Sequence, residues 1–368
     1  MRNFGSIVVF PILVTLAACG SPPTAPPPVP DAPTLSCPAS ASVDSPEGAA
    51  MPVTFTVPTA VGGQTPVTVT CTRVSGSAFA LGSTIVSCTA TDALARQASC
   101  NFNVTVTALP RISKTRFLAF GDSITFGRCD AGGADCPPYT VRLDELLRER
   151  YTRQTFTITN VGVPGEIASD DIADPRGLLA GQDRLAGEMS RYNPEVVLLM
   201  EGANDLYHEQ DNPEFAILSV ELALDRMVSI AQARGVTVLL ATLSPQRSPA
   251  PPGTVARDTV AAMIPLVNDR IRAVAASRGV TVVDVYAAMV NDIPTMISGD
   301  NLHPTAGGLR RIGETFFASI RSAFDVTPTD AVNLLSSAPR IGWEAGPSRL
   351  GGIGTPLQPV AAPRVRRR

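Results

Sequence analysis

Short apolar runs alternate with longer segments of helical spacing between Arg111 and residue 325, and this alternation constrains the fold most. The apolar runs are residues 117–120, 156–160, 196–200, 236–241 and 280–285. The segments with helical spacing are residues 141–150, 178–192, about 212–234, about 255–278 and about 305–324. Strands that alternate with helices in this way predict a parallel sheet covered by helices on both faces. We therefore expect an α/β domain over residues 111–325 with a five-stranded parallel sheet.

Residues 34–108 have a different pattern, which predicts a small all-β sandwich. Runs rich in Val and Thr alternate with period two at residues 53–57, 67–71, 84–90 and 100–106, and Gly, Pro, Ser and Asp separate them. The segment resembles the HYR (hyalin repeat) module of the immunoglobulin-like class. The matching pieces are Cys37-Pro38, Val69-Thr70-Cys71, Ser75-Gly76-Ser77, Cys88 to Asp92 and Ser99 to Phe102. No catalytic cluster is visible there, so we expect a spacer or an adhesive module that binds a glycan or a protein partner.

The N-terminus predicts export. Arg2 precedes an apolar run over Ile7–Ala18, which is too short to span a bilayer as a helix. The run ends in Leu16-Ala17-Ala18-Cys19, which resembles the lipobox of bacterial lipoproteins. That resemblance implies a signal peptide over residues 1–18, lipidation of Cys19 and anchoring in a membrane, with Gly20 favouring the outer membrane or cell surface. An ordinary signal peptide with a nearby cysteine is the alternative.

Linker-like segments flank the two predicted domains. Residues 19–33 are rich in proline and predict an extended stalk between the anchor and the β module. Residues 326–368 are irregular and end in a basic tip, Arg364 to Arg368, which we interpret as a solvated flexible tail. The net charge of −3 does not indicate a nucleic-acid partner.

The cysteine count agrees with an oxidising compartment. Seven cysteines are present, and six remain for three disulfides if Cys19 is lipidated. Cys88 and Cys100 flank a turn near Leu94 and could pair across a hairpin, which would leave Cys37 for Cys71, although three pairings are open. Cys129 and Cys136 are expected to close a small loop or to remain free. A zinc site is disfavoured because no Cys-x2-Cys pair occurs and the chain has two histidines.

Four polar segments come after predicted strands or before the last helix, and the carboxyl ends of parallel strands meet at one edge of the sheet. Gly121-Asp122-Ser123 places a hydroxyl on a strand-to-helix turn. Gly165 and Asn204 each follow a later strand and offer N–H donors. Each of these alone could be an ordinary turn or helix cap. The last segment is Asp300-Asn301-Leu302-His303-Pro304.

His303 is the better of the two candidate bases. Asp300 stands three residues before it, so the carboxylate could bind one ring nitrogen and leave the other to face Ser123. His208 lacks such an arrangement and is expected at the surface of the cleft mouth.

Taken together, the four segments resemble those of the SGNH, or GDSL-type, hydrolases over about residues 116–320. The resemblance implies a flavodoxin-like three-layer fold and a serine ester hydrolase that needs no cofactor and no metal. It also implies a catalytic triad of Ser123, His303 and Asp300, and an oxyanion hole formed by Ser123, Gly165 and Asn204.

The expected substrates are O-acyl esters of carbohydrate or lipid in the cell envelope. We favour carbohydrate or short-chain esters because no long apolar lid is visible between the motifs. The alternative is a lipid-anchored binding or adhesion protein whose hydrolase-like domain does not catalyse.

Overall fold

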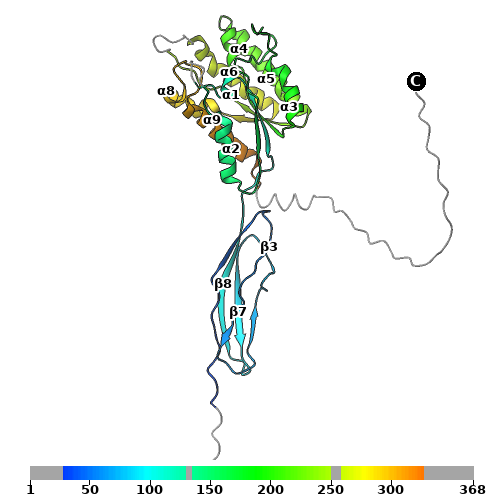
Figure 1. Cartoon of the computed structure of the whole chain (residues 1–368), viewed down its shortest axis with the longest axis vertical. Coiled ribbons are helices and arrows are strands. Elements are labelled where there is room, and N and C mark those ends of the chain that lie inside the picture. The colour runs from blue at the N-terminus through cyan, green and yellow to red at the C-terminus, as the bar shows by residue number, and fades with distance from the viewer. Residues whose placement is uncertain (1–27, 130–134, 250–257, 327–368) are drawn as a thin grey trace, which may run out of the picture.

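The computed structural model describes residues 28–129, 135–249 and 258–326. Figure 1 shows an elongated β module that leads through β8 into an α/β domain. The predicted signal peptide over residues 1–18, the lipidation site Cys19, most of the proline-rich linker and the tail beyond Val326 lie outside the described residues.

A five-stranded parallel sheet forms the centre of the α/β domain, as predicted. Its strands are β9 (Arg116–Gly121), β10 (Thr157–Asn160), β11 (Val196–Met200), β12 (Thr237–Ala241) and β13 (Thr281–Val283). Their order is β10-β9-β11-β12-β13, and every neighbouring pair is parallel. This is the flavodoxin-like order, in which β10 pairs with one side of β9 and the following strands continue from its other side.

Helices cover both faces of the sheet, so the domain has three layers. Leu118 and Phe120 of β9 face one core with α3 (Gly181–Tyr192), α5 (Pro213–Ala233) and α6 (Asp258–Arg278). Phe117 and Ala119 face the other core with α2 (Tyr139–Arg150) and α9 (Ala306–Phe324). Successive side chains of a strand point to opposite faces, which explains why the strands are apolar throughout.

The sequence analysis missed several short helices. They are α1 (Ser123–Phe126), α4 (Ala203–His208), α7 (Val285–Met289), a 3-10 turn (Val290–Asp292) and α8 (Ile293–Met296). These segments are too short for a helical period to be visible in the sequence. Two of them, α1 and α4, begin directly after strands at the edge where the polar segments meet.

The β module is all-β, as predicted. A sheet with the order β2-β8-β7-β5 joins β2 (Ala41–Ser45), β5 (Thr68–Cys71), β7 (Gly82–Thr91) and β8 (Gln97–Ala108). Two smaller pairs join β1 (Thr34–Leu35) with β4 (Ala60–Val61) and β3 (Met51–Pro52) with β6 (Ala78–Phe79). The strand predicted at residues 53–57 is wrong. The paired strand there ends at Pro52, and its partner β6 has only two residues to pair with it.

The suggested pairing of Cys88 with Cys100 is also wrong. The predicted hairpin exists, and the two cysteines are opposite each other in register. However, β5 places Cys71 opposite Cys88 on its other side, with 4.0 Å between the Cα atoms, and the disulfides join Cys71 to Cys88 and Cys37 to Cys100. A central strand has two neighbours, so the sequence distance across one hairpin could not identify the partner.

In the described part of the chain, no helix combines the length and the apolar character needed to cross a bilayer.

Candidate functional site

Ser123 lies at the carboxyl end of β9, where it begins α1. Asp122 caps this helix through its side chain, which accepts a hydrogen bond from the backbone N–H of Ile124 at 2.9 Å. Gly121 allows the turn because a Cβ there would collide with the carbonyl of Met200 and the side chain of Thr125. Ser123 is 6% exposed, so its hydroxyl is largely withdrawn from bulk solvent.

His303 reaches Ser123 from the loop before α9. Its Nε2 lies 2.9 Å from the Ser123 Oγ, and its Nδ1 hydrogen-bonds to the Asp300 carboxylate. The second carboxylate oxygen of Asp300 accepts hydrogen bonds from the Ser298 hydroxyl at 2.7 Å and from the backbone N–H groups of Leu302 and His303. The structure therefore brings together a hydroxyl, an imidazole and a carboxylate from two segments far apart in the sequence.

The hydrogen bonds decide the charge of Asp300. Burial by itself would raise the pKa of this carboxyl, but the donors from His303, Ser298 and the backbone hold the pKa well below its usual range. Asp300 is thus ionised at neutral pH, and it can stabilise an imidazolium beside it.

Gly165 lies on a loop attached to the turn at Ser123. The backbone N–H of Val163 donates to the carbonyl of Gly121 at 2.9 Å, and a Cβ at Gly162 would collide with the backbone of Phe126. Gly165 has φ +75°, a left-handed conformation that glycine adopts without strain. Within the described residues, neither the N–H of Gly165 nor that of Ser123 donates to a protein acceptor.

Asn204 lies in the first turn of α4, after β11. Its Nδ2 donates to the backbone carbonyl of Glu166 at 2.8 Å, so its amide group lies next to the residue that follows Gly165. The next residue, Asp205, accepts the backbone N–H groups of Ala168 and Ser169 at 2.9 and 3.0 Å. Both side chains thus tie α4 to the loop that carries Gly165.

His208 does not join this group. It is exposed at the end of α4, and its ring contacts Tyr207 edge-on. This agrees with the prediction of a surface residue.

The sequence analysis did not identify a set of buried carboxyls behind the site. Burial raises the pKa of Asp122 to about 7 although the N–H of Ile124 opposes it, and burial raises the pKa of Asp205 to about 6 against the N–H groups of Ala168 and Ser169. Burial and the nearby charges of Glu166, Asp122 and Asp205 raise the pKa of Glu201 well above its usual value. Arg184 pairs with the buried Glu166, with its Nη2 2.6 Å from the carboxylate. Nothing in the sequence distinguishes these carboxyls from surface residues.

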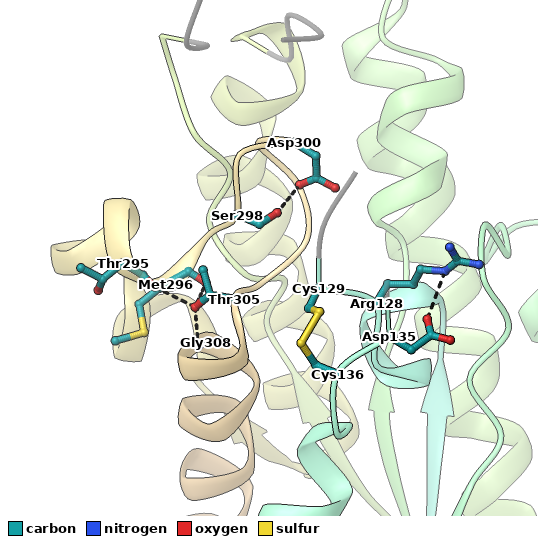
Figure 2. The surroundings of a disulfide bond; sticks show 10 residues. All are labelled: Arg128, Cys129, Asp135, Cys136, Thr295, Met296, Ser298, Asp300, Thr305 and Gly308. Carbon is teal, nitrogen blue, oxygen red and sulfur yellow. Dashed lines mark hydrogen bonds and ion pairs between the residues drawn. A yellow bond between two sulfur atoms is a disulfide. The ribbon is translucent and has the colours of Figure 1, made fainter. Parts of the chain in front are cut away.

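Cys129 and Cys136 form a disulfide shortly after α1. The sequence analysis gave this loop-closing disulfide and a free cysteine pair as its two alternatives. The backbone N–H of Cys136 donates to the carbonyl of Gly127 at 2.9 Å, and Arg128 forms an ion pair with Asp135. Figure 2 shows the surroundings of this disulfide, which include Ser298 and Asp300. The disulfide therefore closes a loop that begins shortly after α1, the helix that starts at Ser123.

Among the described residues, no group of three or more His, Cys, Asp or Glu side chains is placed to hold a metal ion. The groups assembled at Ser123 are those needed for nucleophilic attack, proton transfer and stabilisation of a negative oxygen.

A family model described as the GDSL-like lipase/acylhydrolase family matches residues 119–311, which is more than half of the chain. The chain belongs to the GDSL-like lipase/acylhydrolase family. As a member of this family it is a carboxylic ester hydrolase. A model of the HYR domain matches residues 30–106.

Several solved structures are similar to part of this chain. A lipase/acylhydrolase from Enterococcus faecalis is 21% identical, with 57% of this chain and 97% of that chain covered and a TM-score of 0.46. The aryl esterase of M. smegmatis is 21% identical, with coverages of 56% and 99% and a TM-score of 0.47. An acetylxylan esterase from Geobacillus stearothermophilus is 19% identical, with coverages of 57% and 94% and a TM-score of 0.45. No curated protein matches this GDSL-like hydrolase.

The HYR domain and the disulfides indicate that this GDSL-like hydrolase is extracellular, because disulfides form and persist in oxidising compartments.

Proposed function

We propose that Ser123, His303 and Asp300 form the catalytic triad of a serine ester hydrolase. The observation that carries the proposal is the continuous hydrogen-bonded chain from the Ser123 hydroxyl, 2.9 Å from His303 Nε2, to Asp300 on the opposite ring nitrogen. The same geometry in serine hydrolases allows the imidazole to act as a general base while the carboxylate fixes its tautomer.

In the proposed reaction, Ser123 attacks the ester carbonyl while its proton moves to His303 Nε2. His303 then gives that proton to the alcohol that leaves, and an acyl-enzyme forms on Ser123. Water then attacks the acyl group while His303 takes its proton, and His303 returns that proton to the Ser123 Oγ as the bond to the acyl group breaks and the acid leaves. Asp300 stays ionised throughout and stabilises the imidazolium at each step.

The oxyanion of each tetrahedral intermediate is assigned to three donors. These are the backbone N–H groups of Ser123 and Gly165 and the side-chain amide of Asn204. The bond from the Asn204 Nδ2 to the carbonyl of Glu166 supports this assignment, because it uses one amide hydrogen to orient the other.

We propose O-acyl esters of carbohydrate or lipid in the cell envelope as substrates, with short acyl groups preferred. The absence of a long apolar insertion between the sequence motifs supports short acyl groups. A panel of p-nitrophenyl esters with two to sixteen acyl carbons tests this preference directly. We expect kcat/KM to be highest for the short esters, and a maximum at twelve carbons or more would contradict the preference.

The same assay tests the triad. We expect the wild-type protein to hydrolyse p-nitrophenyl acetate, and Ser123→Ala and His303→Ala to lose that activity while remaining folded by circular dichroism. Wild-type protein without activity would support the alternative of a binding or adhesion protein whose hydrolase-like domain does not catalyse. Ser123→Ala with wild-type activity would contradict the proposed triad.

We also propose the surroundings in which the enzyme works. Residues 1–18 are assigned to a lipoprotein signal peptide, residues 19–33 to the lipidated Cys19 and a linker, residues 34–108 to the HYR-like module, residues 111–325 to the hydrolase domain and residues 326–368 to a tail. The matched ranges 30–106 and 119–311 support this division. A lipid on Cys19 would anchor the protein in the outer membrane or at the cell surface.

The anchor has a simple test. Metabolic labelling with a fatty acid is expected to mark the wild-type protein and not Cys19→Ala. Labelling that persists in Cys19→Ala would exclude this residue as the lipid site.

A further inference from the structure

The guanidinium group of Arg176 lies against the two peptide units that flank Gly165. Its Nη1 donates to the carbonyl of Pro164 at 2.8 Å, and its Nη2 donates to the carbonyl of Gly165. A Cβ at Gly165 would collide with this guanidinium group. The close approach therefore depends on the missing side chain at Gly165.

Asp174 holds Arg176 in this place. Its carboxylate accepts hydrogen bonds from the Arg176 Nε at 3.0 Å, from the Nη2 at 2.6 Å and from the backbone N–H at 2.7 Å. The side chain of Asp174 is 6% exposed, and the hydrogen bond from Arg176 lowers its pKa. Both ends of this ion pair are thus fixed, which is unusual for arginines on a protein surface.

The contact with Pro164 acts directly on the N–H of Gly165. The carbonyl of Pro164 and the N–H of Gly165 belong to the same planar peptide unit and point in opposite directions. Anchoring the oxygen therefore aims the N–H. The second bond fixes the next peptide unit, whose N–H on Glu166 donates to the carbonyl of Val163 at 3.0 Å.

Glycine gains most from such anchoring. It loses more conformational freedom on ordering than any other residue, and Gly165 is held at φ +75°. A cation at the carbonyl oxygen also polarises the amide, which makes its N–H a stronger donor, since linked hydrogen bonds strengthen one another.

We propose that Arg176 is a positioning residue of the oxyanion hole, which aims and polarises the N–H of Gly165 through the peptide unit that they share. The proposal rests on the assignment of Gly165 as an oxyanion donor. Arg176 acts on the hole from behind Gly165 and contacts no reacting atom.

The test compares the kinetics of Arg176→Ala and Arg176→Lys with those of the wild-type protein on p-nitrophenyl acetate. Loss of a whole oxyanion donor typically costs about 10²–10³ in kcat, and we expect misalignment of one donor in Arg176→Ala to cost about 10-fold. KM should change less than about twofold, because the hole binds the transition state more strongly than the substrate. Lysine can reach one carbonyl and cannot bridge two, so Arg176→Lys should have an intermediate kcat.

Two further measurements separate positioning from general stability. The Arg176 side chain is 43% exposed, so guanidine at low millimolar concentration can enter the vacated place and should restore part of the kcat of Arg176→Ala. Inhibition by a boronic acid, which forms a tetrahedral anion on a catalytic serine, should weaken by the same factor as kcat.

Arg234→Ala is the matched control. This exposed arginine also donates to a backbone carbonyl, that of Ile230 at 3.2 Å, and it lies at the end of α5 just before β12 begins.

Several results would overturn the inference. One is a kcat of Arg176→Ala within twofold of wild type. Another is a loss that appears only in KM and only for negatively charged esters, which would make Arg176 a substrate-binding residue. A third is loss of activity and of thermal stability in both variants without rescue by guanidine. An inactive wild-type protein would overturn the proposed function as well, whereas each of the first three results leaves that function in place.

Discussion

Two carboxyls of the site, the half-buried Asp300 and the buried Glu201, differ in the donors around them. Asp300 receives hydrogen bonds from His303, from Ser298 and from two backbone N–H groups. Glu201 is 1% exposed, and both of its carboxyl oxygens lack a hydrogen-bond partner among the described residues. Asp300 has a pKa well below the usual value, and Glu201 has one well above it.

The comparison shows that burial alone does not set the charge of a carboxyl. Donors that replace the lost water lower the pKa of Asp300, whereas burial and the nearby charges of Glu166, Asp122 and Asp205 raise the pKa of Glu201. Asp122 lies between these limits, because a single backbone N–H from Ile124 opposes burial and its pKa is about 7. We therefore expect the ionised carboxylate to serve the reaction and the protonated carboxyl to serve the packing behind it.

The largest expected effect is a difference in kcat between variants of Asp300 and Glu201. Asp300→Asn should lower kcat by about 10³–10⁴, because an amide cannot fix the tautomer of His303 or stabilise its charged form. Glu201→Gln should retain kcat within about threefold, because it keeps a neutral side chain of the same shape. Initial rates on p-nitrophenyl acetate at pH 8 provide the measurement. Equal losses in the two variants would remove the distinction.

Asn204→Ala tests the proposed oxyanion donor. Asn204→Ala should lower kcat by about 10²–10³, the cost of one oxyanion donor. The change should leave KM nearly the same. A fall in kcat of less than threefold would show that the Asn204 amide serves only to bind the carbonyl of Glu166.

The pH dependence of the free energy of unfolding tests whether Glu201 is protonated in the folded protein. The folded pKa of Glu201 lies above its unfolded value, so its contribution to the free energy of unfolding is fully present below about pH 4.5 and is lost as the pH rises. Glu201→Gln should therefore gain stability relative to wild type as the pH rises from 5 to 8, and the two proteins should be similar at pH 5. Urea unfolding at both pH values gives the difference. A gain of equal size at pH 5 and pH 8 would contradict a protonated Glu201.

The smallest expected effect concerns Asp205. Asp205→Asn replaces one of two acceptors with a donor that faces a backbone N–H of the 168–169 segment, and it should destabilise the protein by about 1–3 kcal/mol. We expect a kcat within about threefold of wild type at 15 °C, where the variant remains folded. Thermal unfolding and rates at 15 °C check both parts, and an unchanged unfolding temperature would show that these bonds do not hold the loop.

The sequence predicted the sheet and the five candidate residues because each lies in a motif after a strand or before the last helix. Strand periodicity located Phe117 to Phe120 and Val196 to Met200, and the topology of a parallel sheet then placed Ser123 and Asn204 at one edge. By contrast, Arg176 acts on backbone carbonyls, which carry no sequence signal. Burial is the property that sets Glu201 apart, and one sequence does not show that a carboxyl beside a motif is buried. The disulfides of the β module required the register of three strands, which hairpin spacing does not supply.

Labelling with a fluorophosphonate, followed by peptide mapping, tests the central claim most directly. The reagent phosphonylates a serine hydroxyl only where a neighbouring base makes it nucleophilic, as His303 is placed to do for Ser123 at 2.9 Å. The account predicts a single adduct on Ser123 in the wild-type protein, slower labelling in Asp300→Asn and undiminished labelling in Glu201→Gln. An adduct on another residue, or labelling that continues unchanged in Ser123→Ala, would contradict it.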